Sequence, residues 1–290
     1  MRSRRPPSRL RLLAETDGVL LDFLVHEGAI SEETARAVIA RGGAFVGRRR
    51  VRDPGAPIRA GDRVEVTLRA PGIPALGRER ILHLDDLVLA VDKPAGIAAQ
   101  EDLAGGPALP DLCSALLREA GEARTQALLV HRLDRGTTGV TLLARTRAAQ
   151  AALLAEFREH RARKEYRALV APAPAKGDGI LDAPVDGRRA VTRWQVLERF
   201  SAAALIAAIP ETGRTHQIRL HLQGCGCPIL GDKAHGGATF VTSPSGSRHD
   251  FARPMLHALS LGIRHPRGHE LRIEAPIPAD LQAGRDFLNR

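Results

Sequence analysis

The chain has 290 residues, of which 43% are hydrophobic and 26% are charged, a composition that favours a folded core and argues against general disorder. Its 43 Lys and Arg residues outnumber its 33 Asp and Glu residues, and the resulting net charge of +10 favours a polyanionic partner such as RNA, DNA or an anionic membrane surface. No stretch approaches the roughly 18 apolar residues of a membrane span, and no continuous apolar region follows the basic start, so we expect a cytoplasmic protein.

The first 79 residues predict a small basic module. Residues 1–15 are expected to form a basic, flexible arm, and residues 16–69 a compact domain with two helices and short strands. The second helix is predicted to begin after the N-cap Ser31 and to end at Gly42-Gly43. A short basic turn follows, and residues 70–79 predict a linker because of their prolines and glycines. The basic turn contains Arg48, Arg49 and Arg50.

Residues 80–290 predict a second, larger domain with alternating strands and helices. It has too few regular βαβ units for a doubly wound sheet. Residues 146–159 have the apolar spacing of a core-facing helix, and Thr215 is a candidate N-cap for a helix that follows the apolar strand 204–209. Residues 236–253 are expected to be a flexible loop, and strands at 259–265 and 270–275 close the domain.

The stretch from His131 to Val140 carries the strongest chemical signal. Asp134 lies between Arg132 and Arg135 in a turn flanked by apolar residues. A carboxylate among cations favours its ionised form, which suits a nucleophile or a base and not an acid. The alternative interpretation is a surface turn with a routine Arg–Asp pair.

This stretch resembles the catalytic loop of the RluA-type RNA pseudouridine synthases, whose pattern is His-Arg-Leu-Asp-x-x-Thr-Ser-Gly. It departs from the pattern at Gly136, where Asp is usual, and at Thr138, where Ser is usual. Residues 212–219 match the family's Thr-Gly-Arg-x-His-Gln-Ile-Arg motif closely. Residues 92–96, 164–170 and 254–258 match three further motifs less specifically, and residues 16–68 resemble the α-L RNA-binding domain.

The resemblance implies an α+β protein, in which a small N-terminal α-L domain precedes a catalytic domain with a mixed, mainly antiparallel sheet flanked by helices. It implies isomerisation of uridine to pseudouridine after base flipping, with Asp134 as the catalytic carboxylate and Arg219 as its ion-pair partner. Tyr166 would stack on the target base and move a proton. Expected RNA contacts are Arg132, Arg135, Arg48, Arg49, Arg50, Lys164, Arg214 and His216. Met255 or Leu256 would form the pocket floor, although a plain core role is equally open.

Neither a cofactor nor a metal is expected. The chain has no nucleotide-binding glycine loop, and its three cysteines do not have the spacing of a zinc site. The main alternative is a non-catalytic RNA-binding or ribosome-assembly protein on the same fold. A glycosidase that releases free uracil is a second one, but its usual second carboxylate has no counterpart. Ribosomal RNA is the expected substrate, with transfer RNA open, and a monomer is favoured.

Overall fold

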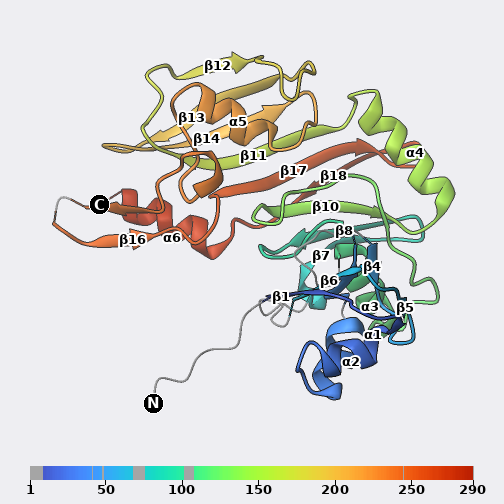
Figure 1. The fold of residues 1–290 in the computed structure, drawn as a ribbon. Coiled ribbons are helices and arrows are strands. Elements are labelled where there is room, and N and C mark those ends of the chain that lie inside the picture. The colour runs from blue at the N-terminus through green and yellow to red at the C-terminus, as the bar shows by residue number, and fades with distance from the viewer. Residues whose placement is uncertain are drawn as a thin grey trace. The chain divides into compact units, whose positions relative to one another are not determined.

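The computed structural model describes residues 9–40, 42–47, 49–67, 76–100, 108–243 and 245–289 (Figure 1). The chain divides into two compact units, Met1–Pro74 with Gln100–Ala108, and Ala75–Ala99 with Leu109–Arg290. None of the described helices is long and apolar enough to cross a membrane. Arg48, the first eight residues of the predicted arm and residues 70–75 of the predicted linker lie outside the described residues.

The first unit has a four-stranded antiparallel sheet in the order β1-β6-β3-β4, and β2 pairs separately with β5. Its core is formed by apolar residues from both helices and from the sheet. As predicted, the Ser31 hydroxyl accepts a hydrogen bond from the Thr34 amide at 3.2 Å at the start of the second helix. The elements are β1 (Arg9–Leu13), β2 (Gly18–Val19), α1 (Leu20–His26), α2 (Glu32–Ala40), β3 (Ala44–Val46), β4 (Arg49–Val51), β5 (Pro57–Ile58) and β6 (Arg63–Thr67).

Part of the predicted flexible arm is a strand. Residues 9–13 form β1, which pairs antiparallel with β6 over five residues. Leu10 and Leu12 pack against the core of this unit, whereas Arg11 alternates with them and is exposed. Alternation of apolar and basic residues is the period-2 pattern of a half-buried strand, and the basic composition of this segment concealed it.

The second unit is built on a ten-stranded sheet in the order β12-β13-β14-β11-β17-β10-β8-β7, with β18 paired to β17 and β9 to β10. The strands are β7 (Ile81–Leu84), β8 (Val88–Lys93), β9 (Leu128–Leu129), β10 (Thr138–Ala144), β11 (Arg163–Val170), β12 (Asp178–Leu181), β13 (Thr192–Arg199), β14 (Ala204–Pro210), β17 (Leu256–Arg264) and β18 (Glu270–Glu274). The helical elements are η1 (Arg78–Arg80), α3 (Leu109–Glu119), α4 (Arg147–Arg158), α5 (Gln217–Gly224), η2 (Lys233–His235) and α6 (Ala279–Leu288).

Strand β17 lies between β11 and β10 in this sheet (Figure 1). Its pairing with β10 is parallel, whereas every other described strand pair is antiparallel. Gly139 on β10 has φ +110°, and a Cβ there would lie 2.1 Å from the carbonyl oxygen of Ala258, so the approach of the two strands requires glycine. The predicted α+β class with a mixed, mainly antiparallel sheet is confirmed.

Two local predictions have different outcomes. The helix predicted over 146–159 is α4, and the Thr146 hydroxyl caps it by accepting from the Ala149 amide. The loop expected over 236–253 instead contains a hairpin of β15 (Phe240–Thr242) and β16 (Arg248–Asp250). Its strands are three residues long, and Arg248 stacks over the Phe240 ring at 4.0 Å. Strands this short leave no periodic signal in a segment rich in Gly, Ser and Thr.

Candidate active site

The loop that carries Asp134 is held from both sides. It connects β9 to β10, and the Asp134 carbonyl accepts a hydrogen bond from the Thr137 amide. His131 at its start stacks on Phe157 of α4 and accepts a hydrogen bond at Nε2 from the Leu142 amide at 2.9 Å. Burial lowers the pKa of His131 to about 3, so the ring stays neutral as that acceptor requires. The histidine of the motif therefore fixes the backbone of the loop.

Lys93 supports the same loop through its backbone carbonyls. Its side chain is fully buried, and Nζ donates to the carbonyls of Pro94, Ile97 and Arg135 at 3.1, 3.0 and 3.3 Å. Burial lowers the pKa of Lys93 to about 7. A buried ammonium whose donors end on backbone carbonyls is a structural group, so Lys93 supports the loop and does not reach solvent.

Arg219 brings the Asp134 carboxylate into a fixed position, as the sequence predicts. Its Nη1 lies 3.0 Å from Oδ2 of Asp134. Oδ1 of Asp134 lies 3.8 Å from Nε2 of His216, and the Asp134 side chain is 24% exposed. One oxygen is therefore held by the arginine, while the carboxylate stays open to an incoming ligand.

A second carboxylate, Asp232, holds the arginine. Nε and Nη2 of Arg219 each lie 2.7 Å from an oxygen of Asp232, which has no exposed surface. These hydrogen bonds to Asp232 and Asp134 outweigh the burial of Arg219, and the pKa of the guanidinium is raised. No sequence motif gave a role to Asp232. A second acceptor for Arg219 could have been expected, because one carboxylate cannot satisfy the five donors of a buried arginine.

His216 and His235 form a hydrogen-bonded pair beside Asp134. His216 Nδ1 lies 3.0 Å from His235 Nε2, and the rings meet edge to face. His216, and not Thr215, is the N-cap residue of α5, and it has the left-handed φ of 56°. The predicted Thr215 cap is wrong because its hydroxyl accepts from Nη2 of Arg132 at 3.1 Å instead. The strained backbone of His216 turns its ring toward Asp134.

Tyr166 is half-buried on β11, opposite Ala208 of β14 and Ala258 of β17. The pairing with β17 shifts register between Glu165 and Tyr166. Burial raises the pKa of Tyr166, and the charge of Asp134 raises it further, so the phenol remains protonated. Small residues beside Tyr166 and its proximity to Asp134 fit an aromatic platform next to the carboxylate.

The remaining predicted side chains of this unit are four basic residues, expected to contact RNA, and two apolar residues, expected to form the pocket floor. Arg132 is exposed, Arg135 donates to the Gly96 carbonyl, and Arg214 donates through Nε to the Arg189 carbonyl. Lys164 donates to the Thr212 carbonyl at 3.0 Å, and burial lowers its pKa to about 8. Met255 and Leu256 are 1% and 3% exposed and belong to the hydrophobic core on which Tyr166 packs, which matches the alternative that they are plain core residues.

The two described arginines of the basic segment in the first unit differ from each other. Arg49 is exposed on β4, whereas Arg50 is half-buried and stacks over the Phe45 ring at 5.1 Å. Arg50 therefore contributes to packing through its guanidinium, and Arg49 presents its charge to solvent.

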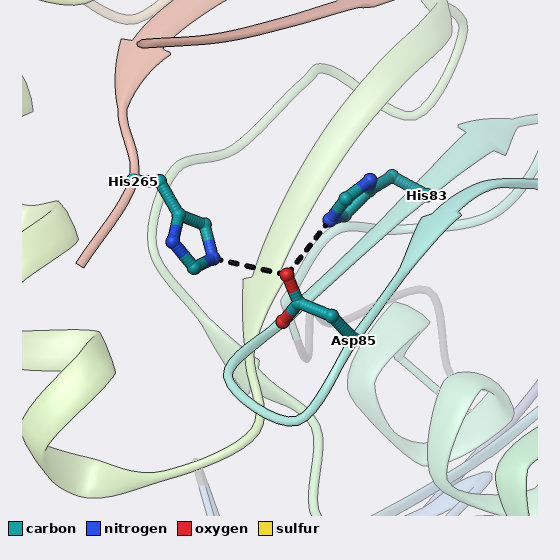
Figure 2. Close-up of side chains that lie close together, drawn as sticks. All are labelled: His83, Asp85 and His265. Carbon is teal, nitrogen blue, oxygen red and sulfur yellow. Dashed lines mark hydrogen bonds and ion pairs between the residues drawn. The ribbon is translucent and has the colours of Figure 1, made fainter. Parts of the chain in front are cut away.

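One group of side chains among the described residues has donor atoms close enough to suggest a metal (Figure 2). Nε2 of His83 and Nε2 of His265 each lie 3.0 Å from Oδ2 of Asp85. The Arg267 amide donates to Nδ1 of His265, which assigns the proton of the neutral ring to Nε2. A protonated Nε2 cannot ligate a metal. The group instead bridges the β7–β8 turn to the β17–β18 hairpin through one carboxylate.

Comparisons with known proteins agree with this geometry. A family model described as RNA pseudouridylate synthase matches residues 87–224. Ribosomal large subunit pseudouridine synthase D of Xanthomonas campestris is 38% identical over 225 residues, 70% of this chain and 67% of the relative. Ribosomal large subunit pseudouridine synthase C of Salmonella typhi is 35% identical over 252 residues, 80% of this chain and 77% of the relative. The solved structure of human RNA pseudouridylate synthase domain containing 4 has a TM-score of 0.60 and 25% identity, covering 72% of this chain and 93% of that one.

Proposed function

Because this chain belongs to the RNA pseudouridine synthase family and isomerises uridine in RNA, we propose that Asp134 is its single catalytic carboxylate and large-subunit ribosomal RNA its substrate. The observation that carries the catalytic assignment is the Arg219–Asp134 ion pair at 3.0 Å, in which the carboxylate is fixed but 24% exposed. The names of the relatives from Xanthomonas campestris and Salmonella typhi support the ribosomal substrate.

The reaction breaks the bond from uracil N1 to ribose C1′, forms a bond from C5 to C1′, and moves one proton from C5 to N1. It is redox-neutral and needs a group that handles the sugar while the base rotates. Asp134 serves either by attacking C1′ or by taking the 2′ proton to give a glycal. Both routes require a carboxylate fixed on one side by Arg219 and open on the other, which is the arrangement around Asp134.

Tyr166 is proposed to bind the flipped base. Base–aromatic stacking contributes roughly 1–3 kcal/mol per base, which offsets part of the cost of roughly a few kcal/mol for taking the uridine out of its stack. The raised pKa of Tyr166 keeps its hydroxyl protonated, so it can donate a hydrogen bond or a proton to the base but does not start as a phenolate base.

The first unit is proposed to add sequence-independent RNA affinity as an α-L module. Arg49 supports this role because it is exposed on β4. Exposed Lys and Arg side chains bind phosphates with an affinity that falls steeply with salt. The expected contact Arg48 lies outside the described residues.

Pseudouridine mapping in a deletion strain tests the function. Carbodiimide-dependent reverse-transcriptase stops in total RNA should disappear at specific uridines and return with the wild-type gene but not with Asp134→Asn. If the protein were a non-catalytic RNA-binding protein, the wild-type and the Asp134→Asn genes would restore the stops equally. Free uracil released from RNA by the purified protein would indicate the glycosidase. Loss of sites only in transfer RNA would overturn the ribosomal substrate and leave the enzyme assignment intact.

A further inference from the structure

A cleft of about 350 Å³ lies beside the candidate active site, lined by Val185, Asp186, Arg188, Gly213, Arg214 and Thr215. This volume is at the lower end of ligand pockets, which run from roughly 300 to 1,000 Å³. Its walls come from two segments of the second unit, the hairpin 185–188 and the loop 213–215, which we call together the Arg188–Arg214 cleft.

The hairpin wall of the Arg188–Arg214 cleft is rigid. Val185 and Arg188 exchange two backbone hydrogen bonds of 3.0 Å around the two-residue turn Asp186-Gly187. Asp186 and Gly187 have φ values of 50° and 69°, as in a type I′ turn. Val185 is 3% exposed and anchors this turn to the core. Arg188 therefore projects from a fixed base.

The opposite wall is fixed by Gln217 of α5. Its Oε1 accepts the Arg214 amide at 3.0 Å, and its Nε2 donates to the Val191 carbonyl and the Thr192 hydroxyl, each at 3.0 Å. Gln217 is 4% exposed. The guanidinium of Arg214 is oriented by one hydrogen bond from Nε to the Arg189 carbonyl. This orientation leaves its two terminal nitrogens for a ligand.

The charges of the cleft favour an anion. Among the described residues, no carboxylate lies within ion-pair distance of Arg188 or Arg214. Asp186 is the one acidic residue of the lining, against two arginines. Lys164 lies behind Gly213, where a Cβ would be 3.9 Å from its ammonium nitrogen. Planar guanidinium groups present paired donors that match phosphate oxygens.

The cleft adjoins the catalytic carboxylate through consecutive residues. Thr215 lines the cleft and bonds Arg132, two residues before Asp134. The next residue, His216, faces Asp134 at 3.8 Å. The residue that lines the cleft is thus followed directly in the chain by the histidine that faces Asp134.

We infer that the Arg188–Arg214 cleft binds the phosphodiester of a nucleotide adjacent to the target uridine, with Arg188 and Arg214 both contacting the phosphate. This inference rests on the proposed function, because it needs Asp134 to mark the position of the target. It assigns a role to Arg188, which no motif of the sequence indicates. The subsite would hold the RNA strand in register while the target base leaves the stack.

The test is a scan of neutral phosphates in a short RNA centred on a uridine that the mapping experiment identifies. One methylphosphonate at a time replaces each phosphate on either side of the target. Wild-type protein, Arg188→Ala, Arg214→Ala and the control Arg189→Ala are compared for KM, kcat and the salt dependence of binding. Arg189 is an exposed neighbour outside the lining, and its carbonyl bond to Arg214 survives the substitution.

We expect KM to rise about tenfold in each cleft variant, as for removal of one charge-assisted hydrogen bond, with kcat within about twofold. The slope of log affinity against log salt should fall by up to about 0.7 when the phosphate is less neutralised. One methylphosphonate position should weaken wild type more than it weakens either cleft variant, because each variant keeps only one of the two arginines on that phosphate. A penalty as large as in wild type at every position in both variants, or an equal rise of KM in Arg189→Ala, would overturn the inference. Absence of conversion by the wild-type protein would refute the proposed function instead.

Discussion

Replacing Arg219 with methionine should destabilise the second unit by about 3–5 kcal/mol, because it strands the buried carboxylate of Asp232. Asp232 has no exposed surface, and its two oxygens bond only Arg219 among the described side chains. Asp134, the other partner of the arginine, is 24% exposed and can be solvated when the arginine is removed. The loss of stability in Arg219→Met is therefore expected to come from the unpaired Asp232 and not from Asp134.

The second-site changes make this assignment measurable. Asp134→Asn combined with Arg219→Met should restore no stability, since the buried charge of Asp232 remains. Asp232→Asn combined with Arg219→Met should restore about half of the stability, because a stranded neutral amide costs only about 1–3 kcal/mol. Asp134→Asn alone should change the free energy of unfolding by less than about 1 kcal/mol while activity falls below about 1% of wild type.

The assay is urea unfolding followed by the fluorescence of Trp194. It is the only tryptophan of the chain and is 8% exposed on β13, so its emission reports the second unit alone. A restored midpoint in the Asp134→Asn double variant, or an unchanged midpoint in Arg219→Met, would refute the reasoning. The first result would show that Asp134 is the stranded charge, and the second that the pair contributes nothing to stability.

Three further predictions follow from individual side chains. Tyr166→Phe should keep its affinity for RNA but lose most of its turnover, and turnover equal to wild type would show that the ring alone suffices. Burial alone would raise the pKa of Asp85, but the amides of residues 87 and 88 and the ring of His83 lower it from 3.8 to about 2. A depressed carboxylate pKa stabilises the folded protein above pH 3.8, and this stabilisation is lost as the pH falls toward 2. For Asp85 the free energy involved is about 2 kcal/mol. Melting temperatures between pH 5 and 2 should therefore vary less for Asp85→Asn than for wild type. Arg49→Ala should lower the salt slope of RNA binding without changing the melting temperature, whereas Arg50→Ala should lower the melting temperature, and the reverse pattern would exchange their roles.

The parts of the fold that the sequence predicts are those with a strong local pattern. Helix α4 has both an apolar stripe and a Thr146 cap, so its bounds were predicted to within one residue. Local rules failed where a long-range partner decides the structure. Thr215 has the chemistry of an N-cap but bonds Arg132, which is 83 residues away. Strand β1 looked like a basic arm because its partner β6 lies about fifty residues later.

In the candidate site too, residues in local motifs were predicted and residues that depend on a distant partner were missed. Asp134 and Arg219 were identified together because each belongs to a specific motif, and the fold brings them to 3.0 Å from each other. Asp232 was missed because its role depends on what Arg219 needs and not on its own neighbours in the chain. His235 was missed for a similar reason, since only its bond to His216 connects it with the site. The motifs predict Asp134 and its partner Arg219, but Asp232 and His235, which hold Arg219 and His216, are known only once the fold is given.

The position of β17 determines when the sheet of the second unit can be completed during synthesis on the ribosome. Residues 256–264 separate β10 from β11, so the strand after the Asp134 loop and the strand that carries Tyr166 have no common neighbour until that segment has been made. At roughly 5–20 residues per second, the roughly 110 residues between β10 and β17 take about 5 to 20 seconds to synthesise. Until β17 is made, β10 and, once it has formed, β11 each present an open edge. The nascent chain should therefore remain catalytically inert, and a target for chaperones, until residues 256–264 have emerged.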